Sequence, residues 1–168
     1  EEKDALLIIS PRHPERFSKV YRMIQNKDFT VSRRSKKEEV LEKTNVLLGD
    51  TMGELIFLYS ISDIAFVGGS IIDHGGQNLL EPAALGLSIC SGSNLRNFEE
   101  IASQLKKEGG LVIVKNSVDV SKFFLQTIFE KEELTRRGNA SKKVFQMNKG
   151  AVEKIYYALL PHLDAQLN

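Results

Sequence analysis

The chain carries short, almost wholly apolar runs that alternate with longer stretches in which apolar residues recur at helical spacing. The runs are rich in Ile, Val and Leu, and they cover residues 5–10, 29–32, 45–50, 63–68, 87–90 and 111–114. Continuous apolar runs of this length are typical of strands that are buried on both faces of a parallel sheet. The pattern therefore predicts a strand at each run.

Segments with the length and spacing of helices lie between and after these runs. They cover residues 14–25, 52–60, 79–85, 98–107 and 118–131, then 132–148 and, after Gly150, the rest of the chain. This alternation indicates an α/β protein with a Rossmann-like parallel sheet and helices on both of its faces. Because no repeat and no long linker divides the sequence, we expect a single domain over residues 1–168.

The amino-acid composition argues against several classes of function. Lys and Arg total 23 and Asp and Glu total 22, so the net charge of +1 provides no general field for nucleic acid, and we expect no nucleic-acid partner. A single cysteine, Cys90, with three scattered histidines makes a structural metal site an unfavourable interpretation. The chain opens on Glu-Glu-Lys-Asp and enters an apolar run at once, so we expect a piece of a longer protein.

Ligands of open parallel sheets bind beyond the carboxyl ends of the strands, where the following helices begin with unpaired N–H groups. The first such junction is Ser10-Pro11-Arg12-His13-Pro14. Pro14 suits the first turn of a helix, and Arg12 adds a cation beside the strand end. A phosphate or carboxylate would fit there, although a proline-shaped turn with a solvated arginine explains the same residues.

The second junction is residues 49–54, where Thr51 and Glu54 match the T-x-x-E pattern of a capping box. A capped helix start is a sufficient structural reason for both residues. Such a box would also leave the N–H groups of Met52 and Gly53 at the helix start, where a glycine allows a ligand to approach the backbone closely.

The third junction is the stretch FVGGSIIDHGGQNLLEPAALG at residues 66–86, which contains five glycines. We predict a helix with Asn78 as its N-cap and Glu81 at its third position. Glu81 either closes its own cap or turns its carboxylate toward the vicinal hydroxyls of a ribose. The charged run RRSKKEE at residues 33–39 is most simply a solvated loop, with contact to an anionic surface as the alternative.

Familiar catalytic and phosphate-binding signals are absent from the sequence. It contains no G-x-x-x-x-G-K-[ST] loop, no G-x-G-x-x-G after the first strand and no nucleophile elbow. Phosphate would therefore have to be held by helix starts and arginine, and we expect neither a metal nor another cofactor.

Six stretches carry a resemblance to a known family: SPRHPERF, RRS, VLLGDTMGEL, SDIAFVGGS, GGQNLLEPAALG and NFEEI, in this order. Together they resemble the carboxy-terminal half of the Kdo transferases, which attach 3-deoxy-D-manno-octulosonic acid (Kdo) to a lipid A precursor in Gram-negative bacteria. The resemblance extends from about residue 6 to about residue 155.

This resemblance implies the donor-binding domain of a GT-B glycosyltransferase, an enzyme of two Rossmann-like halves that face one cleft. It implies CMP-Kdo as donor and the lipid A precursor lipid IVA as acceptor, with inversion at the sugar and release of CMP. The acceptor and the general base are expected in an amino-terminal domain, so the isolated chain should bind nucleotide without transferring sugar. The whole protein is expected to associate peripherally with the cytoplasmic face of the bacterial inner membrane.

By the same resemblance, CMP is held at the three junctions. The implied residues are Pro11 and Arg12, then Met52, Gly53 and Glu54, and then Asn78, Leu79, Leu80 and Glu81. Arg12 and the helix-start N–H groups would stabilise the charge that grows on the phosphate as CMP leaves, and Glu81 would anchor the ribose.

The sequence departs from the family pattern near the third junction. Gln77 and Leu79 stand where histidine and proline are common, and Ser88, Ser93 and Asn94 stand where proline, proline and histidine are common. The role of the loop at residues 93–97 is left open.

Two other functions use the same features. A UDP-sugar transferase or epimerase of this architecture would bind ribose through the same glutamate and would prefer UMP to CMP. A non-catalytic nucleotide-sensing or protein-interaction module would need no general base at all.

Overall fold

The computed structural model describes residues 5–150. The chain divides into two compact units, of which unit 1 ends at Ser62 and unit 2 begins at Asp63. Each unit contains its own three-stranded parallel sheet.

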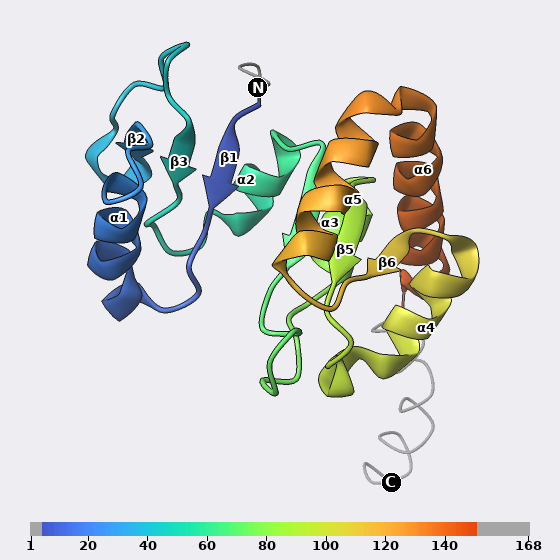
Figure 1. Cartoon of the computed structure of the whole chain (residues 1–168). Helices are drawn as coiled ribbons and strands as arrows, with labels where there is room; N and C mark the ends of the chain where they lie inside the picture. Colours follow the sequence, from blue (N-terminus) through green and yellow to red (C-terminus); the bar gives the residue numbers. More distant parts are fainter. Residues whose placement is uncertain (1–4, 151–168) are drawn as a thin grey trace, which may run out of the picture. The chain divides into compact units, whose positions relative to one another are not determined.

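Unit 1 has the strand order β1-β3-β2. Its strands are β1 (Leu7–Ile9), β2 (Val31–Arg33) and β3 (Val46–Leu48), and its helices are η1 (Pro14–Arg16), α1 (Phe17–Gln25), η2 (Arg34–Lys36) and α2 (Leu55–Ser60). In Figure 1, α1 lies along the sheet, and its Ile24 packs against Val46 and Leu48 of β3. The middle strand β3 is buried at every position, which its continuous apolar run predicts.

Unit 2 has the strand order β4-β5-β6. Its strands are β4 (Ile64–Val67), β5 (Ser88–Ser91) and β6 (Leu111–Ile113), and its helices are α3 (Leu80–Ala84), η3 (Arg96–Phe98), α4 (Glu99–Glu108), α5 (Ser117–Phe129) and α6 (Lys131–Asn148). Successive residues of a strand point to opposite faces of a sheet. Ile89 of β5 packs in a cluster with α3, α4 and α6, whereas Cys90 packs with Phe123 of α5, so helices cover both faces.

The structure confirms the α/β class, the six predicted strands and the helices predicted within residues 5–150, with small shifts of their ends. The helix expected after Gly150 lies outside the described residues. The strands are divided between two sheets, one in each compact unit. The single domain over residues 1–168 stays a prediction.

Candidate functional site

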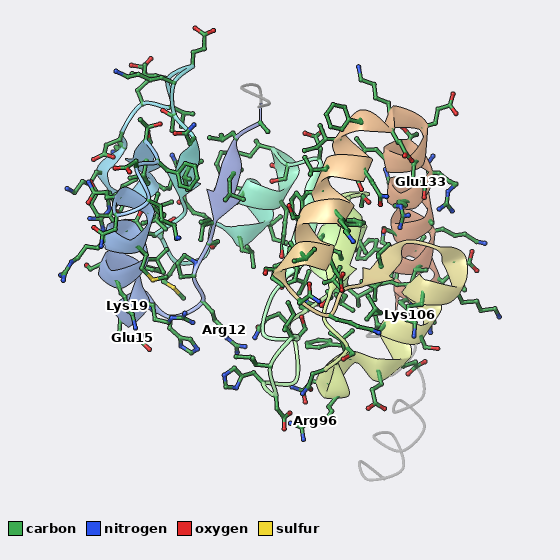
Figure 2. The ribbon with its side chains drawn as sticks, viewed as in Figure 1. Arg12, Glu15, Lys19, Arg96, Lys106 and Glu133 are labelled. Atoms are coloured by element: carbon green, nitrogen blue, oxygen red, sulfur yellow. The ribbon has the colours of Figure 1, made fainter. Side chains whose placement is uncertain are left out.

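The first junction follows β1 in unit 1. Pro14 begins η1 at the first helical turn, as its fixed φ predicts. Pro11 is half-buried, and Arg12 is exposed on the turn between β1 and η1, where Figure 2 labels it. The structure thus presents a guanidinium at the carboxyl end of β1.

The second junction follows β3, the neighbour of β1 in the same sheet. The Gly49 N–H donates to the carbonyl oxygen of Ile9 over 2.8 Å, and a Cβ built on Gly49 would lie 3.5 Å from the Cβ of Ser10. The first two junctions therefore adjoin each other at the carboxyl edge of the unit 1 sheet. Beyond them, Met52 is 66% exposed and Gly53 adopts a φ of +80°.

The predicted capping box is wrong. Thr51 donates its hydroxyl to the carboxylate of Glu54, but no side chain among residues 5–150 caps the start of α2, which begins at Leu55. The reason is a partner twenty residues away, because Arg34 binds Glu54 with Nε at 3.1 Å and a second nitrogen at 2.8 Å. The positive φ of Gly53 also keeps these residues out of the helix.

Asp50 is the most strongly held carboxylate of this junction, with a fully buried side chain. Arg33 Nε donates to it over 2.7 Å, and the backbone N–H and hydroxyl of Ser35 donate over 2.8 and 2.7 Å. Burial acts to raise the pKa of Asp50, but the hydrogen bonds from Ser35 and Arg33 outweigh it and hold that pKa below its ordinary value.

The charged run at residues 33–39 is therefore only partly a solvated loop. Arg33 is 19% exposed at its side chain, stacks over the ring of Tyr21 and pairs with Asp50. Arg34 stacks over Phe57, and its hydrogen bond, with that of Thr51, lowers the pKa of Glu54. The sequence identified the motif RRS but gave no indication that its arginines bind the second junction.

The third junction lies in unit 2, between β4 and α3. Asn78 Oδ1 accepts from the N–H of Leu80 over 2.9 Å, but the N-cap of α3 is Leu79, so the predicted N-cap is wrong by one residue and the bond from Asn78 lies just outside the helix. Asn78 Nδ2 in turn donates to Glu81 Oε1 over 3.1 Å and fixes the direction of that carboxylate. Leu79 is fully buried in the core, so its side chain anchors the start of α3 and is not presented to a ligand.

Sequence analysis missed the residues that hold the glycine-rich loop. Ser70 is fully buried, and its hydroxyl donates to the Val67 carbonyl over 2.8 Å and accepts from the Gly92 N–H over 2.7 Å. The Asn94 N–H donates to the Ser70 carbonyl over 2.9 Å. The loop after β5 thus fastens the loop after β4, and only the small size of Ser70 and Gly92 could have pointed to this packing.

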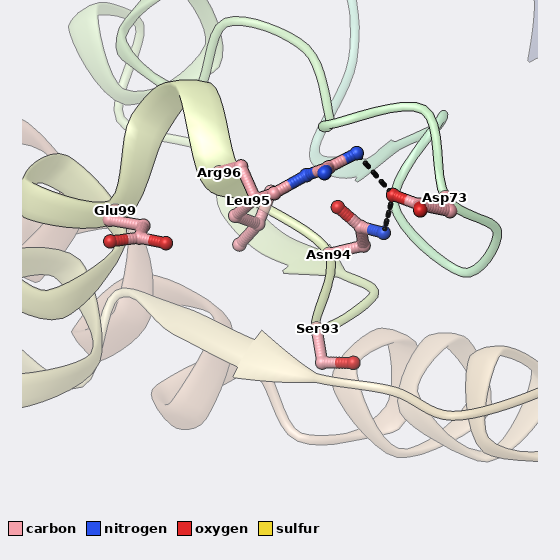
Figure 3. A pocket seen from close by; sticks show the side chains of 6 residues that line it. All are labelled: Asp73, Ser93, Asn94, Leu95, Arg96 and Glu99. Atoms are coloured by element: carbon pink, nitrogen blue, oxygen red, sulfur yellow. Dashed lines mark hydrogen bonds and ion pairs between the residues drawn. The ribbon is translucent and has the colours of Figure 1, made fainter.

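Figure 3 shows an open pocket at the same place. Its lining residues are Asp73, Ser93, Asn94, Leu95, Arg96 and Glu99. Asp73 accepts a hydrogen bond from Asn94 Nδ2 over 2.6 Å and pairs with Arg96. These bonds give the 93–97 loop a structural role in unit 2, because they add a second link to the glycine-rich loop.

Neither a metal cluster nor a reactive thiol is found among residues 5–150. No group of three His, Cys, Asp or Glu side chains in this range could hold a metal ion. Burial raises the pKa of Cys90 to about 12, so its thiol stays protonated at neutral pH, and the side chain packs in the core instead of acting as a nucleophile. Within the same range, no helix is long and apolar enough to cross a bilayer.

No family model matches the chain. It is 41% identical over 160 residues to 3-deoxy-D-manno-octulosonic acid transferase of Haemophilus influenzae, covering 95% of this chain and 38% of that protein. The enzyme of the same name from Bordetella pertussis is 32% identical over 155 residues, covering 92% of this chain and 36% of that protein. The chain thus spans well under half the length of these curated relatives.

A solved structure gives the same result. The crystal structure of the C-terminal CMP-Kdo binding domain of WaaA from Acinetobacter baumannii matches with a TM-score of 0.83 and 34% sequence identity. The match covers 86% of this chain and 76% of that one. The relatives are named as sugar transferases, and these likenesses place the chain in the glycosyltransferase class. Within that class the chain belongs to the Kdo transferase family and corresponds to its carboxy-terminal domain.

Proposed function

We propose that the chain binds the donor CMP-Kdo for a Kdo transferase. The observation that carries this proposal is the likeness to a domain whose structure is described as CMP-Kdo binding, at 34% identity over most of both chains. The cytidine nucleotide is the common part of donor and product, so CMP alone is a suitable probe.

The nucleotide contacts are assigned to the residues of the three junctions. Pro11 and Arg12, Met52 to Glu54, and Asn78 to Glu81 supply them. Arg12 pairs with the phosphate, and a charge-assisted hydrogen bond of this kind is worth about 1.5 to 3 kcal/mol. Glu81, whose direction is fixed by Asn78, accepts from the ribose hydroxyls. The exposed backbone at Met52 and Gly53 supports close approach of the ligand.

The chemistry of the whole protein follows from the same assignment. An acceptor hydroxyl of the lipid A precursor attacks the anomeric carbon of Kdo, the bond to the phosphate oxygen breaks, and CMP leaves. Preorganised donors such as Arg12 stabilise the charge that develops on the phosphate. The general base and the acceptor site belong to the amino-terminal domain, so this chain by itself is expected to bind nucleotide and transfer nothing.

Calorimetric titration with CMP tests the assignment. We expect CMP to bind more tightly than UMP, and Arg12→Ala to weaken CMP binding roughly 10- to 150-fold, which corresponds to about 1.5 to 3 kcal/mol. Arg16→Ala is the matched control, since it removes the same charge from an exposed position four residues later. A preference for UMP would favour a UDP-sugar enzyme, and equal affinities of wild type and Arg12→Ala would exclude the role of Arg12.

The location of the whole protein is proposed on the same basis. Its acceptor is a membrane lipid, so we expect peripheral association with the cytoplasmic face of the inner membrane. Fractionation of cells that express the full-length protein should find it with membranes and release it by alkaline wash. Recovery in the high-speed supernatant without any wash would contradict this location.

A further inference from the structure

The loop that follows β2 binds the loop that follows β3. These strands are parallel neighbours, so their carboxyl ends lie at the same edge of the unit 1 sheet. Arg33 and Ser35 bind Asp50, and Arg34 binds Glu54. Two charged contacts therefore hold the segment 50–54 at both of its ends.

The residues between these ends are the least constrained part of the junction. Met52 is 66% exposed, and no atom of the part of the chain that the structure describes lies within 4 Å of a Cβ built on Gly53. Gly53 also has a φ of +80°, in a region that glycine enters and leaves at little cost. The conformation of this exposed backbone thus depends on the two contacts that fix its ends.

The two contacts differ in what they do for the protein. Asp50 is fully buried at its side chain, so its removal would disturb the fold itself. The side chains of Arg34 and Glu54 are 39% and 32% exposed, and half-exposed pairs contribute little to stability. The Arg34 guanidinium nevertheless binds both oxygens of Glu54 and stacks over Phe57, which fixes its orientation. Such geometry orders the segment without carrying much of the stability.

We propose that Arg34 is a positioning residue for nucleotide binding. It holds Glu54, and through Glu54 the backbone of Met52 and Gly53, in the conformation that accepts the ligand. This inference rests on the proposed function, which assigns Met52 to Glu54 to the nucleotide. Arg34 acts through Glu54, because two of its guanidinium nitrogens bind that carboxylate, while its Cζ lies 5.2 Å from the centroid of the Phe57 ring.

A double-mutant cycle tests the proposal on the 168-residue chain with CMP as the probe. Arg34→Ala should weaken CMP binding roughly five- to tenfold, because the segment must then be ordered on binding. Glu54→Gln should weaken CMP binding less in the Arg34→Ala background than in wild type, since the bond from Arg34 is then already absent and only the other contacts of Glu54 remain to be lost. Lys36→Ala is the matched control: it removes the same charge from an exposed residue of the same turn and should leave CMP affinity unchanged.

A second measurement separates ordering from folding. In the absence of CMP, the amides of residues 52–54 should exchange hydrogen faster in Arg34→Ala than in wild type, at nearly equal melting temperatures. Arg34→Lys keeps the charge without the planar fork and should recover only part of the protection.

Unchanged CMP affinity in Arg34→Ala overturns the proposal, and additive losses in the cycle overturn the route through Glu54. If the wild-type chain fails to bind CMP, the proposed function falls with the assignment of residues 52–54. Amide exchange then still decides whether Arg34 orders the segment, and equal exchange in wild type and variant rejects that role.

Discussion

Two serines of β5 give a sharp test of the hydrogen bonds in unit 2. Ser88 and Ser91 lie at the two ends of the strand, and both are 0% exposed. The Ser91 hydroxyl donates to the Val67 carbonyl over 2.8 Å. Within residues 5–150, the Ser88 hydroxyl has no hydrogen-bond partner. The same substitution, serine to alanine, should therefore change stability in opposite directions at the two positions.

The magnitudes follow from the two environments. In Ser91→Ala the Val67 carbonyl keeps its bond from Ser70, so the loss is one ordinary hydrogen bond, about 1 kcal/mol. A buried hydroxyl without a partner costs about 1 to 3 kcal/mol, and Ser88→Ala removes that cost while leaving a small void. The net gain should be about 1 kcal/mol, so the two variants should differ by about 2 kcal/mol.

Urea unfolding followed by far-ultraviolet circular dichroism measures this difference. The m-value should stay unchanged while the midpoint rises for Ser88→Ala and falls for Ser91→Ala. In thermal melts the variants should differ by about 4 to 8 °C, at 2 to 4 °C for each kcal/mol in a chain of this size. If Ser88→Ala were destabilised as much as Ser91→Ala, the Ser88 hydroxyl would have a partner and the reasoning would be refuted.

Three further predictions concern the junctions and the packing of α6. A Cβ on Gly92 would lie 2.2 Å from the Ser70 carbonyl oxygen, so Gly92→Ala should lower the free energy of unfolding, measured in urea, by about 1 to 3 kcal/mol. Gly68→Ala is the control and should cost far less, because the nearest atom to a Cβ on Gly68 is 3.9 Å away. Folding lowers the pKa of Asp50 below its ordinary value of 3.8, so the ionised carboxylate stabilises the folded chain above pH 3.8, and this stabilisation is lost as the pH falls through the lowered pKa. In urea unfolding at a series of acid pH values, the free energy of unfolding should therefore depend less on pH in Asp50→Asn than in wild type. A Cβ on Gly138 would lie 2.2 Å from the Gly86 carbonyl oxygen, so Gly138→Ala should lower the melting temperature although alanine favours helices, and a rise would contradict the close packing.

The strands, and a hydrogen bond at the start of α3, could be predicted because their causes are local. A run such as VLL at residues 46–48 is apolar on both faces, and in the structure it is the buried middle strand. Asn78 accepts from the N–H of Leu80, two residues away, at the start of α3. Signals of this kind lie within a few residues of one another and can be found in a single sequence.

The second junction could not be predicted because its partners are distant in sequence. Glu54 has the spacing of a capping residue, but Arg34 binds its carboxylate, and no other side chain within residues 5–150 caps α2. Arg33 and Asp50 are seventeen residues apart, and only the parallel pairing of β2 with β3 brings them together. The link from Asp73 to Asn94 likewise depends on the neighbouring strands β4 and β5.

An amide chemical-shift titration of the 168-residue chain with CMP tests the central claim most directly. The account predicts that the shifted amides gather at Arg12, at residues 52–54 and at residues 78–81, with saturation at one common affinity. Shifts confined to other surfaces, or no shifts at millimolar CMP, would contradict nucleotide binding by these residues.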